Sequence, residues 1–228
     1  EGAVHVVYAR SAVAHGTINS IDTTEARSMP GVIGVYTAAD LGLEPLPSAF
    51  NPAVARTLLA SGKVRWVGEP LAAIVAETYE QATDAAQTVD ADIDALPALI
   101  DMEEALASDV HIYEAAGGNA VFDTTFMGGS LNTGPEFFEG CEVVINETLM
   151  NQRVAPCPLE PRGAAVAWVD DRLLVWVSSQ RVQGIKDGLA AAAGVDAGQV
   201  RVMTPDVGGG FGAKIGVYSE ELLLGRLA

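Results

Sequence analysis

The stretch Val207-Gly208-Gly209-Gly210-Phe211-Gly212-Ala213-Lys214 decides how the C-terminal part of this chain folds. Four of the six residues from Gly208 to Ala213 are glycines, and a large aromatic residue interrupts them. Glycine adopts positive φ without steric cost and lets a backbone approach a ligand closely. Successive backbone N–H groups in such a loop form a concave site for anions. The loop is therefore predicted to contact a ligand.

Two common phosphate-binding motifs do not explain this loop. A Walker loop needs a glycine directly before its lysine and a hydroxyl residue after it, but Ala213 and Ile215 occupy these positions. A Rossmann fingerprint needs an acidic residue about 20 positions further on, and Glu220 and Glu221 come too soon. The other alternative is a glycine-rich turn whose Phe211 is inserted into the core.

The segments around the loop predict an α/β arrangement. An apolar strand over residues 200–203 leads directly into the glycines, and a helical pattern follows. The carboxyl end of a strand is where α/β proteins bind ligands. Upstream, strands over 164–169 and 173–177 are joined by Asp170-Asp171, and a helix over 183–194 ends at Gly194.

The first hundred residues alternate predicted strands with predicted helices. Thr78 and Gln81 form a capping box at the start of one helix. Residues 101–104 predict the acidic first turn of another, short helix. Residues 42–62 have little periodicity and predict a long loop. The predicted strands span 4–9, 16–21, 32–36, 64–67, 71–76 and 91–100, the last interrupted by Pro97, and the predicted helices span 22–29 and 78–89.

A change in composition after residue 107 predicts the domain organisation. Residues 108–134 are polar, irregular and rich in glycine. We expect them to link a first domain over 1–107 to a second over 135–228; the alternative is a long surface loop within one domain. Residues 141–150 predict a further strand. Both chain ends are expected to be cuts through a longer polypeptide, because residue 1 is not methionine and residues 221–228 stop inside a helical pattern.

The composition excludes several classes of protein. Hydrophobic residues make up 49% of the 228, and the mean hydropathy of +0.24 argues against a disordered chain. The formal net charge of −17 repels nucleic-acid phosphates and anionic lipid surfaces. No apolar run reaches the length of about 18 residues that a membrane helix needs. We therefore expect no nucleic-acid partner and no membrane partner.

Cysteine and histidine provide no predicted metal site. Cys141 and Cys157 are the only cysteines, too few for a disulfide framework or a zinc quartet, which favours a cytoplasmic location. Cys157, between two prolines, is predicted to be a small buried hydrophobe. No metal-ligand spacing relates the three histidines, His5, His15 and His111.

Several segments, in order along nearly the whole chain, resemble the large subunits of molybdenum hydroxylases, the group of xanthine dehydrogenase, aldehyde oxidase and aerobic carbon monoxide dehydrogenase. The resemblance implies an α+β fold, an α/β hammerhead domain followed by the first part of a mixed α/β molybdopterin-binding domain. Its C-terminal segments are most similar to the carbon monoxide dehydrogenase branch. The segments that carry it are 9–16, 29–32, 64–72, 158–163, 177–180 and 205–214.

The resemblance also implies a cofactor and partners. Gly209, Gly210, Phe211 and Gly212 would contact a molybdenum-bearing molybdopterin, in its cytosine dinucleotide form. A 2Fe-2S small subunit and an FAD medium subunit would carry electrons away from a small substrate hydroxylated with oxygen from water. The rest of the molybdenum subunit would complete the site, and we expect this chain to be inactive alone.

Departures from the family pattern limit what carries over. Ile215 stands where the xanthine-oxidising branch has a substrate-binding glutamate, so a purine substrate is not expected. The family's catalytic glutamate and the copper-holding cysteine of carbon monoxide dehydrogenases fall beyond Ala228. No catalytic residue is therefore assigned. The alternatives are a non-catalytic scaffold that docks redox subunits and one half of a split large subunit.

Three further polar residues lie in the matching segments. Glu160 and Arg162 are predicted to pair with each other, either beside the cofactor or as a structural ion pair at a domain junction. Gln180, at a strand end, is a candidate hydrogen-bond partner of the pterin; the alternative is a structural role.

Overall fold

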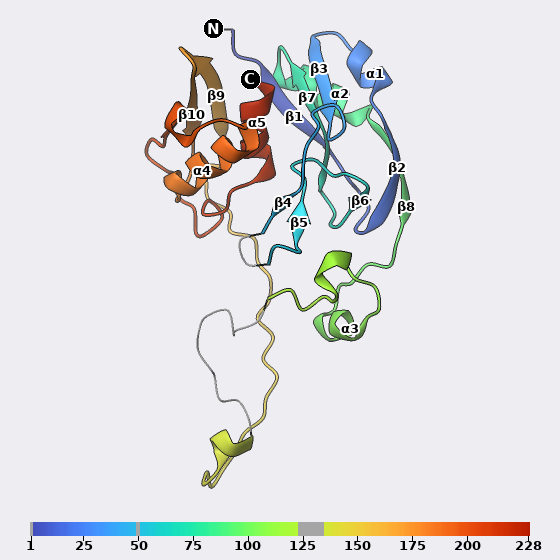
Figure 1. The fold of residues 1–228 in the computed structure, drawn as a ribbon, viewed down its shortest axis with the longest axis vertical. Coiled ribbons are helices and arrows are strands. Elements are labelled where there is room, and N and C mark those ends of the chain that lie inside the picture. Colours follow the sequence, from blue (N-terminus) through green and yellow to red (C-terminus); the bar gives the residue numbers. More distant parts are fainter. Residues whose placement is uncertain (1, 49–50, 123–134) are drawn as a thin grey trace.

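The computed structural model describes residues 2–48, 51–122 and 135–228. Figure 1 shows two adjacent α/β units and an extended arm that projects away from both. The N-terminal unit contains two three-stranded sheets, and the C-terminal unit contains one.

The first sheet has the order β1-β7-β3, with both pairings antiparallel. Its strands are β1 (His5–Arg10), β7 (Pro70–Ala76) and β3 (Val32–Thr37). Every residue of β7 is buried, because this central strand is covered on both faces and its sequence PLAAIVA is continuously apolar. Helix α2 (Tyr79–Gln87) packs on β1 and β7 through Ala82 and Ala85.

The second sheet of the N-terminal unit has the order β6-β2-β8 and is also antiparallel. Its strands are β6 (Lys63–Val64), β2 (Gly16–Asp22) and β8 (Asp90–Ala95). Helix α1 (Thr24–Ser28) packs on β3 and α2 of the first sheet. Helix α3 (Met102–Ala107) and the 3-10 turn η1 (Glu114–Ala116) follow β8 along the chain.

Three expectations for the N-terminal unit need correction. The predicted strand over 64–67 ends at Val64, because the backbone N–H of Arg65 donates to the Glu69 carboxylate (2.6 Å) and the chain turns there. The predicted loop over 42–62 contains a two-stranded ribbon of β4 (Leu46–Pro47) and β5 (Ala55–Arg56). The predicted strand over 91–100 ends at Ala95, before Pro97. The remaining predicted strands and helices of this unit form within a few residues of their expected ends, including the capping box of α2.

The C-terminal unit is a sheet of order β11-β10-β9 with two helices. Strands β9 (Ala164–Val169) and β10 (Arg172–Val177) form the predicted hairpin, and Asp170 and Asp171 both have the positive φ that a tight hairpin turn requires. Strand β11 (Val200–Met203) pairs with β10 in parallel. The remaining elements are α4 (Val182–Ala193), η4 (Ala197–Gln199) and α5 (Ser219–Leu227).

The arm between the two units corrects another expectation. The predicted strand over 141–150 does not form, since no strand within the described residues pairs with it. Its apolar side chains are exposed, with Leu149 and Met150 at 90% and 85%. Near the tip of the arm, the described residues include a 3-10 turn, η3 (Pro135–Phe138) (Figure 1).

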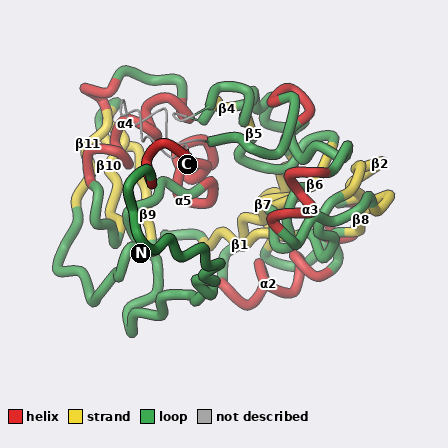
Figure 2. The backbone as a smooth tube through the Cα atoms, turned by 90° about the horizontal axis from the view of Figure 1, so that it is seen from below, coloured by secondary structure: helices red, strands yellow, loops and turns green. Residues whose placement is uncertain are grey.

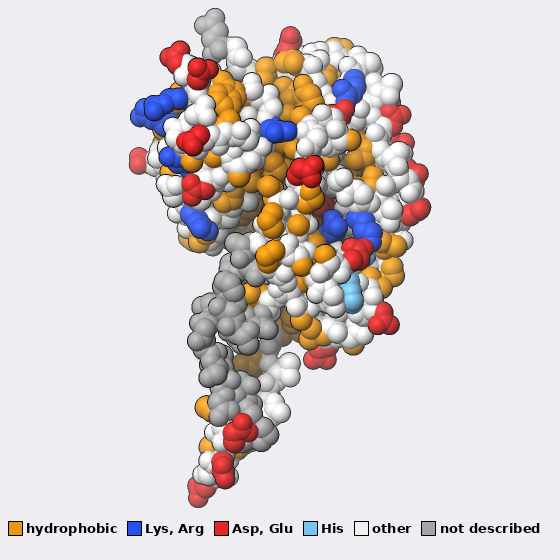
Figure 3. Space-filling model, in the orientation of Figure 1, with side chains coloured by type: hydrophobic (Ala, Val, Ile, Leu, Met, Phe, Trp, Pro, Cys, Tyr) orange, Lys and Arg blue, Asp and Glu red, His pale blue; other side chains and the backbone are white. Residues whose placement is uncertain are grey.

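The two units share one hydrophobic core. Leu58, Leu59 and Ala73 of the N-terminal unit belong to the same buried cluster as Leu173 and Leu189 of the C-terminal unit. Figure 2, seen from below, shows β9 and α5 on the side of the C-terminal unit that faces β1. Tyr8 of β1 reinforces this junction by donating a hydrogen bond to the backbone oxygen of Glu220 (2.7 Å). On the face drawn in Figure 3, hydrophobic side chains run down the middle of the molecule, and charged ones lie mostly toward its edges.

Candidate functional site

The parallel pairing of β10 with β11 builds the candidate site. Parallel strands end at the same edge of a sheet, so the segments that follow them lie side by side. Ser178, Ser179 and Gln180 follow β10, and the glycine loop follows β11 after Thr204-Pro205-Asp206. The backbone N–H of Gln180 donates to the Lys214 carbonyl at 2.9 Å, which joins the two segments directly.

The glycine loop turns through left-handed backbone conformations. Gly209 and Gly212 have φ of +93° and +90°, and Phe211 itself has φ of +50°. Phe211 is 77% exposed, so the alternative in which this ring fills the core is wrong. A Cβ at Gly212 would meet open space, with no atom within 4 Å. The loop therefore exposes Phe211 and Gly212 at its surface, whereas Gly210 is buried.

The opposite side of the loop is held by Glu160. One carboxylate oxygen of Glu160, Oε2, accepts three hydrogen bonds: from the Gly208 backbone N–H (2.6 Å), the Ser178 hydroxyl (2.9 Å) and the Lys214 ammonium (2.7 Å). These bonds, led by that from Lys214, lower the pKa of Glu160 from 4.5 to about 2. The carboxylate thus fixes both ends of the loop.

Lys214 is enclosed at the end of the loop. Its side chain is fully buried, and Glu160 is the carboxylate that neutralises it. Its backbone N–H donates to Gln180 Oε1 (3.2 Å), and its carbonyl accepts from the Ser179 hydroxyl (3.3 Å). The lysine is therefore a structural anchor here, unlike the phosphate-binding lysine of a Walker loop.

Glycine is required at two loop positions for lack of space. A Cβ at Gly208 would lie 2.6 Å from Glu160 Cβ, and one at Gly210 would lie 2.3 Å from Gln180 Oε1. A side chain at Gly208 would displace Glu160 at its Cβ, and one at Gly210 would displace the carboxamide of Gln180, which accepts from the Lys214 backbone N–H.

Arg162 belongs to a different group of contacts. It pairs with Glu221 of α5 at 3.2 Å, and its guanidinium carbon lies 3.5 Å from the centre of the Tyr218 ring. The predicted pair of Glu160 with Arg162 is therefore wrong, because each residue has another partner. Burial raises the pKa of Glu221, and the charge of Arg162 opposes that shift.

Two other expectations concern cysteine and histidine. Cys157 is exposed, which corrects the prediction that it is a buried hydrophobe. His15 is 2% exposed, and its Nδ1 lies 2.9 Å from the Pro97 carbonyl oxygen. It is therefore a buried structural histidine. Within the described ranges, no group of three or more His, Cys, Asp or Glu side chains could hold a metal ion.

Sequence reasoning identified the glycine loop but missed the residues that fix it. Lys214 and Ser178 lie inside segments that resemble the family, yet their bonds to Glu160 span 54 and 18 positions. A glutamate that accepts hydrogen bonds from both ends of a distant loop leaves no pattern in the neighbouring sequence. The available signal was a charged residue, Lys214, next to an apolar segment. A lysine that becomes buried needs a carboxylate partner, which can come from a distant part of the chain.

The geometry fits a cofactor with polar edges. The loop exposes the backbone of Gly212 and the Phe211 ring, and Glu160, Gln180 and Lys214 hold it in place. The family model of the molybdopterin cofactor-binding domain matches residues 112–228. The model of the aldehyde oxidase and xanthine dehydrogenase a/b hammerhead domain matches residues 1–97. This chain belongs to the molybdenum hydroxylase large-subunit family.

Similar proteins agree with this assignment. The nicotine 6-hydroxylase large subunit of Paenarthrobacter nicotinovorans is 35% identical over 98% of this chain and 28% of its own length. The carbon monoxide dehydrogenase large chain of Hydrogenophaga pseudoflava is 31% identical over 95% of this chain and 29% of its own length. The crystal structure of quinoline 2-oxidoreductase from Pseudomonas putida 86 superposes with a TM-score of 0.84 at 31% identity, over 99% of this chain and 30% of that one.

This chain is much shorter than its relatives. It spans less than a third of the length of the relatives it matches. The fold is the expected α+β combination of a hammerhead domain and the molybdopterin-binding domain. Among the described residues, no helix is both long and apolar enough to cross a membrane.

Proposed function

We propose that this chain forms one wall of the molybdenum cofactor site in the large subunit of a molybdenum hydroxylase. The observation that carries the proposal is the loop Gly209–Gly212, which exposes Phe211 and Gly212 while Glu160 holds the residues on either side of it. Gly209, Gly210 and Gly212 would bring backbone groups to the pterin, and Phe211 would limit one side of the pocket. The proposed domain limits remain 1–107 and 135–228, joined by 108–134.

The residues of this chain would act by holding and orienting. When bound, the molybdenum cofactor supplies the redox chemistry that hydroxylates a substrate carbon with oxygen from water. The three bonds to Glu160 keep the loop in one conformation, so that its N–H groups are oriented before the cofactor binds. Gln180, in contact with both Gly210 and Lys214, is positioned to contribute its carboxamide beside the same pocket. The general base and the remaining walls would come from the rest of the subunit.

Several finer features rest on family resemblance. The cytosine dinucleotide form of the cofactor, the 2Fe-2S and FAD partner chains and a cytoplasmic location stay predictions. Relatives that are subunits of complexes, such as the gamma subunit of the 6-hydroxypseudooxynicotine dehydrogenase complex, support partner chains in general.

Metal analysis of the native protein, isolated with the chains that accompany it, tests the proposal. We expect molybdenum near one atom per chain, together with iron and flavin, and release of cytidine monophosphate on hydrolysis of the cofactor. Gly210→Ala should lower the molybdenum content, because the added methyl displaces Gln180. Gly118→Ala is the matched control, since a Cβ there meets open space.

A native preparation without molybdenum, but with its partner chains, would overturn the proposal. It would favour the second candidate, a non-catalytic scaffold that docks redox subunits. An equal molybdenum content in Gly210→Ala and wild type would contradict the role given to the loop.

A further inference from the structure

One face of the β4–β5 ribbon carries four side chains toward a single hollow. Leu46 and Arg56 are cross-strand partners. Side chains two positions apart in an extended strand point to the same face, which adds Ser48 and Val54. The backbone N–H of Ser48 donates to the Val54 carbonyl (3.0 Å) and extends the pairing to these residues. All four line a hollow of about 430 Å³.

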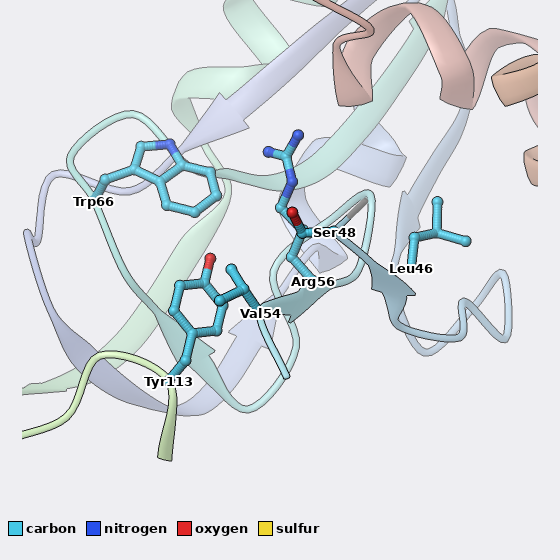
Figure 4. Close-up of a pocket in the computed structure, with 6 residues that line it drawn as sticks. All are labelled: Leu46, Ser48, Val54, Arg56, Trp66 and Tyr113. Atoms are coloured by element: carbon cyan, nitrogen blue, oxygen red, sulfur yellow. The ribbon is translucent and has the colours of Figure 1, made fainter. Parts of the chain in front are cut away.

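Two aromatic side chains from other segments form the opposite wall. Figure 4 shows Trp66, from the turn before β7, and Tyr113, from the segment before η1, on the side of the hollow away from Leu46. Both are half-buried. The hollow therefore has an aliphatic and polar side and an aromatic side, built from three separate stretches of chain.

Arg65 and Glu69 hold the aromatic wall in place. The Arg65 guanidinium lies 4.9 Å from the centre of the Tyr113 ring, and its Nε donates to the Ile112 carbonyl (3.1 Å). Glu69, only 3% exposed, accepts from the Arg65 backbone N–H. The Tyr113 ring is thus fixed in advance of any ligand, which lowers the entropic cost of binding.

Arg56 leaves a positive charge in the hollow. Its guanidinium lies 5.7 Å from the centre of the Trp66 ring, and it forms no ion pair with any residue that the structure describes. Glu69 interacts with the charges of both Arg65 and Arg56. The Arg65 side chain donates to the Ile112 carbonyl, whereas Arg56 keeps donors that can meet a carboxylate in a paired geometry. In a chain of net charge −17, such a cation is a local site for an anion.

We propose that this hollow is a binding site for a small aromatic carboxylate, whose ring packs against Trp66 and Tyr113 and whose carboxylate accepts hydrogen bonds from Arg56. The volume lies within the range of about 300–1,000 Å³ typical of small-molecule sites. Aromatic rings stack favourably on Trp and Tyr, and the planar guanidinium matches a carboxylate. None of the lining residues belongs to the glycine loop or its anchors, so the site is separate from the proposed cofactor site.

Binding of benzoate to the intact purified protein tests the proposal, by calorimetry and by saturation-transfer NMR on the benzoate protons. We expect a dissociation constant on the order of 1 mM. Arg56→Gln should weaken binding about tenfold or more, since it removes a charge-assisted hydrogen bond. Arg56→Lys should lie between the two, because lysine cannot form the paired geometry. Benzamide, without the charge, and acetate, without the ring, should both bind more weakly than benzoate.

The controls separate this site from binding elsewhere. Arg172→Gln removes another exposed arginine, on β10, and should leave benzoate binding unchanged. Trp66→Leu should weaken binding with Arg56 intact, and thermal melting confirms that each variant is folded. Benzoate binding that persists unchanged in both Arg56→Gln and Trp66→Leu lies at another site and would overturn the proposal. Equal binding of acetate and benzoate, or no binding of benzoate, would overturn it too.

Discussion

At the scale of single residues, the contact between Glu160 and Lys214 is asymmetric. The Lys214 side chain is fully buried, whereas that of Glu160 is 36% exposed. A buried charge left without its partner costs far more than one that can turn to water. The two partners of this ion pair should therefore respond differently to substitution.

We predict that Glu160→Gln destabilises the protein more than Lys214→Met does. The first substitution leaves a buried ammonium without a counter-charge, and the second leaves a carboxylate that solvent can hydrate. Urea unfolding of both variants measures the order. Hydrogen exchange of a peptide over 205–214 should be about tenfold faster in Glu160→Gln, because local opening becomes easier. A larger loss of stability in Lys214→Met would contradict this assignment.

The depressed pKa of Glu160 predicts how the loop responds to acid. A carboxyl whose pKa falls on folding stabilises the folded state above its unfolded pKa, and this contribution disappears as the pH drops through the folded pKa. For Glu160 the window runs from about 4.5 down to about 2. Local opening of 205–214, measured as hydrogen exchange relative to the intrinsic exchange rate at each pH, should be rare at pH 5 and rise below about pH 4. In Glu160→Gln the acid-dependent rise should be absent.

At the scale of secondary structure elements, helix α2 depends on its N-terminal cap. The Thr78 hydroxyl accepts from the Gln81 backbone N–H (3.2 Å), and the Gln81 side chain accepts from the Thr78 backbone N–H (3.1 Å). Both donors would otherwise lack a partner within the helix. The cap also sets where α2 begins to cover β1 and β7.

Thr78→Ala should lower the free energy of unfolding by about 1 kcal/mol, the usual cost of losing a threonine cap. Thr83→Ala is the matched control, because the Thr83 hydroxyl bonds to the Tyr79 carbonyl inside the same helix and caps nothing. Chemical denaturation compares the two. Equal losses in both variants would mean that the cap contributes no special stability.

At the scale of the whole molecule, the shared core predicts cooperative unfolding of the two units. Leu59, from the N-terminal unit, is completely buried in the cluster that contains Leu173, Ile185 and Leu189 of the C-terminal unit. Removing its side chain leaves a cavity at the junction. The junction is continuous hydrophobic packing, in contrast to a mobile contact between independent domains.

Leu59→Ala should therefore cost about 2–5 kcal/mol and shift unfolding of both units together. Circular dichroism and tryptophan fluorescence should report one coincident transition in wild type and variant. Leu106→Ala, at an exposed position of α3, should change stability little. Two separate transitions, with only the first shifted in Leu59→Ala, would show that the units unfold independently.

Features with a local cause were predictable from the sequence. The capping box of Thr78, the hairpin turn at Asp170-Asp171 and the end of α4 at Gly194 each depend on a few neighbouring residues, and all are confirmed. The predicted strand over 141–150 failed for the opposite reason, because a strand is stable only beside a partner. Its apolar, β-branched residues predict a tendency to extend, and no described strand pairs with it.

By itself, the sequence determined the local elements, the position of the glycine loop after a strand and the family to which the chain belongs. Only the tertiary structure decided that Glu160 binds Lys214 while Arg162 binds Glu221. Charge and proximity in sequence favoured a pair between Glu160 and Arg162. The actual partners lie 54 and 59 positions away, where the parallel strands and α5 deliver them. Which charges meet is set by the path of the folded backbone, because ion pairs depend on distance in space rather than along the chain.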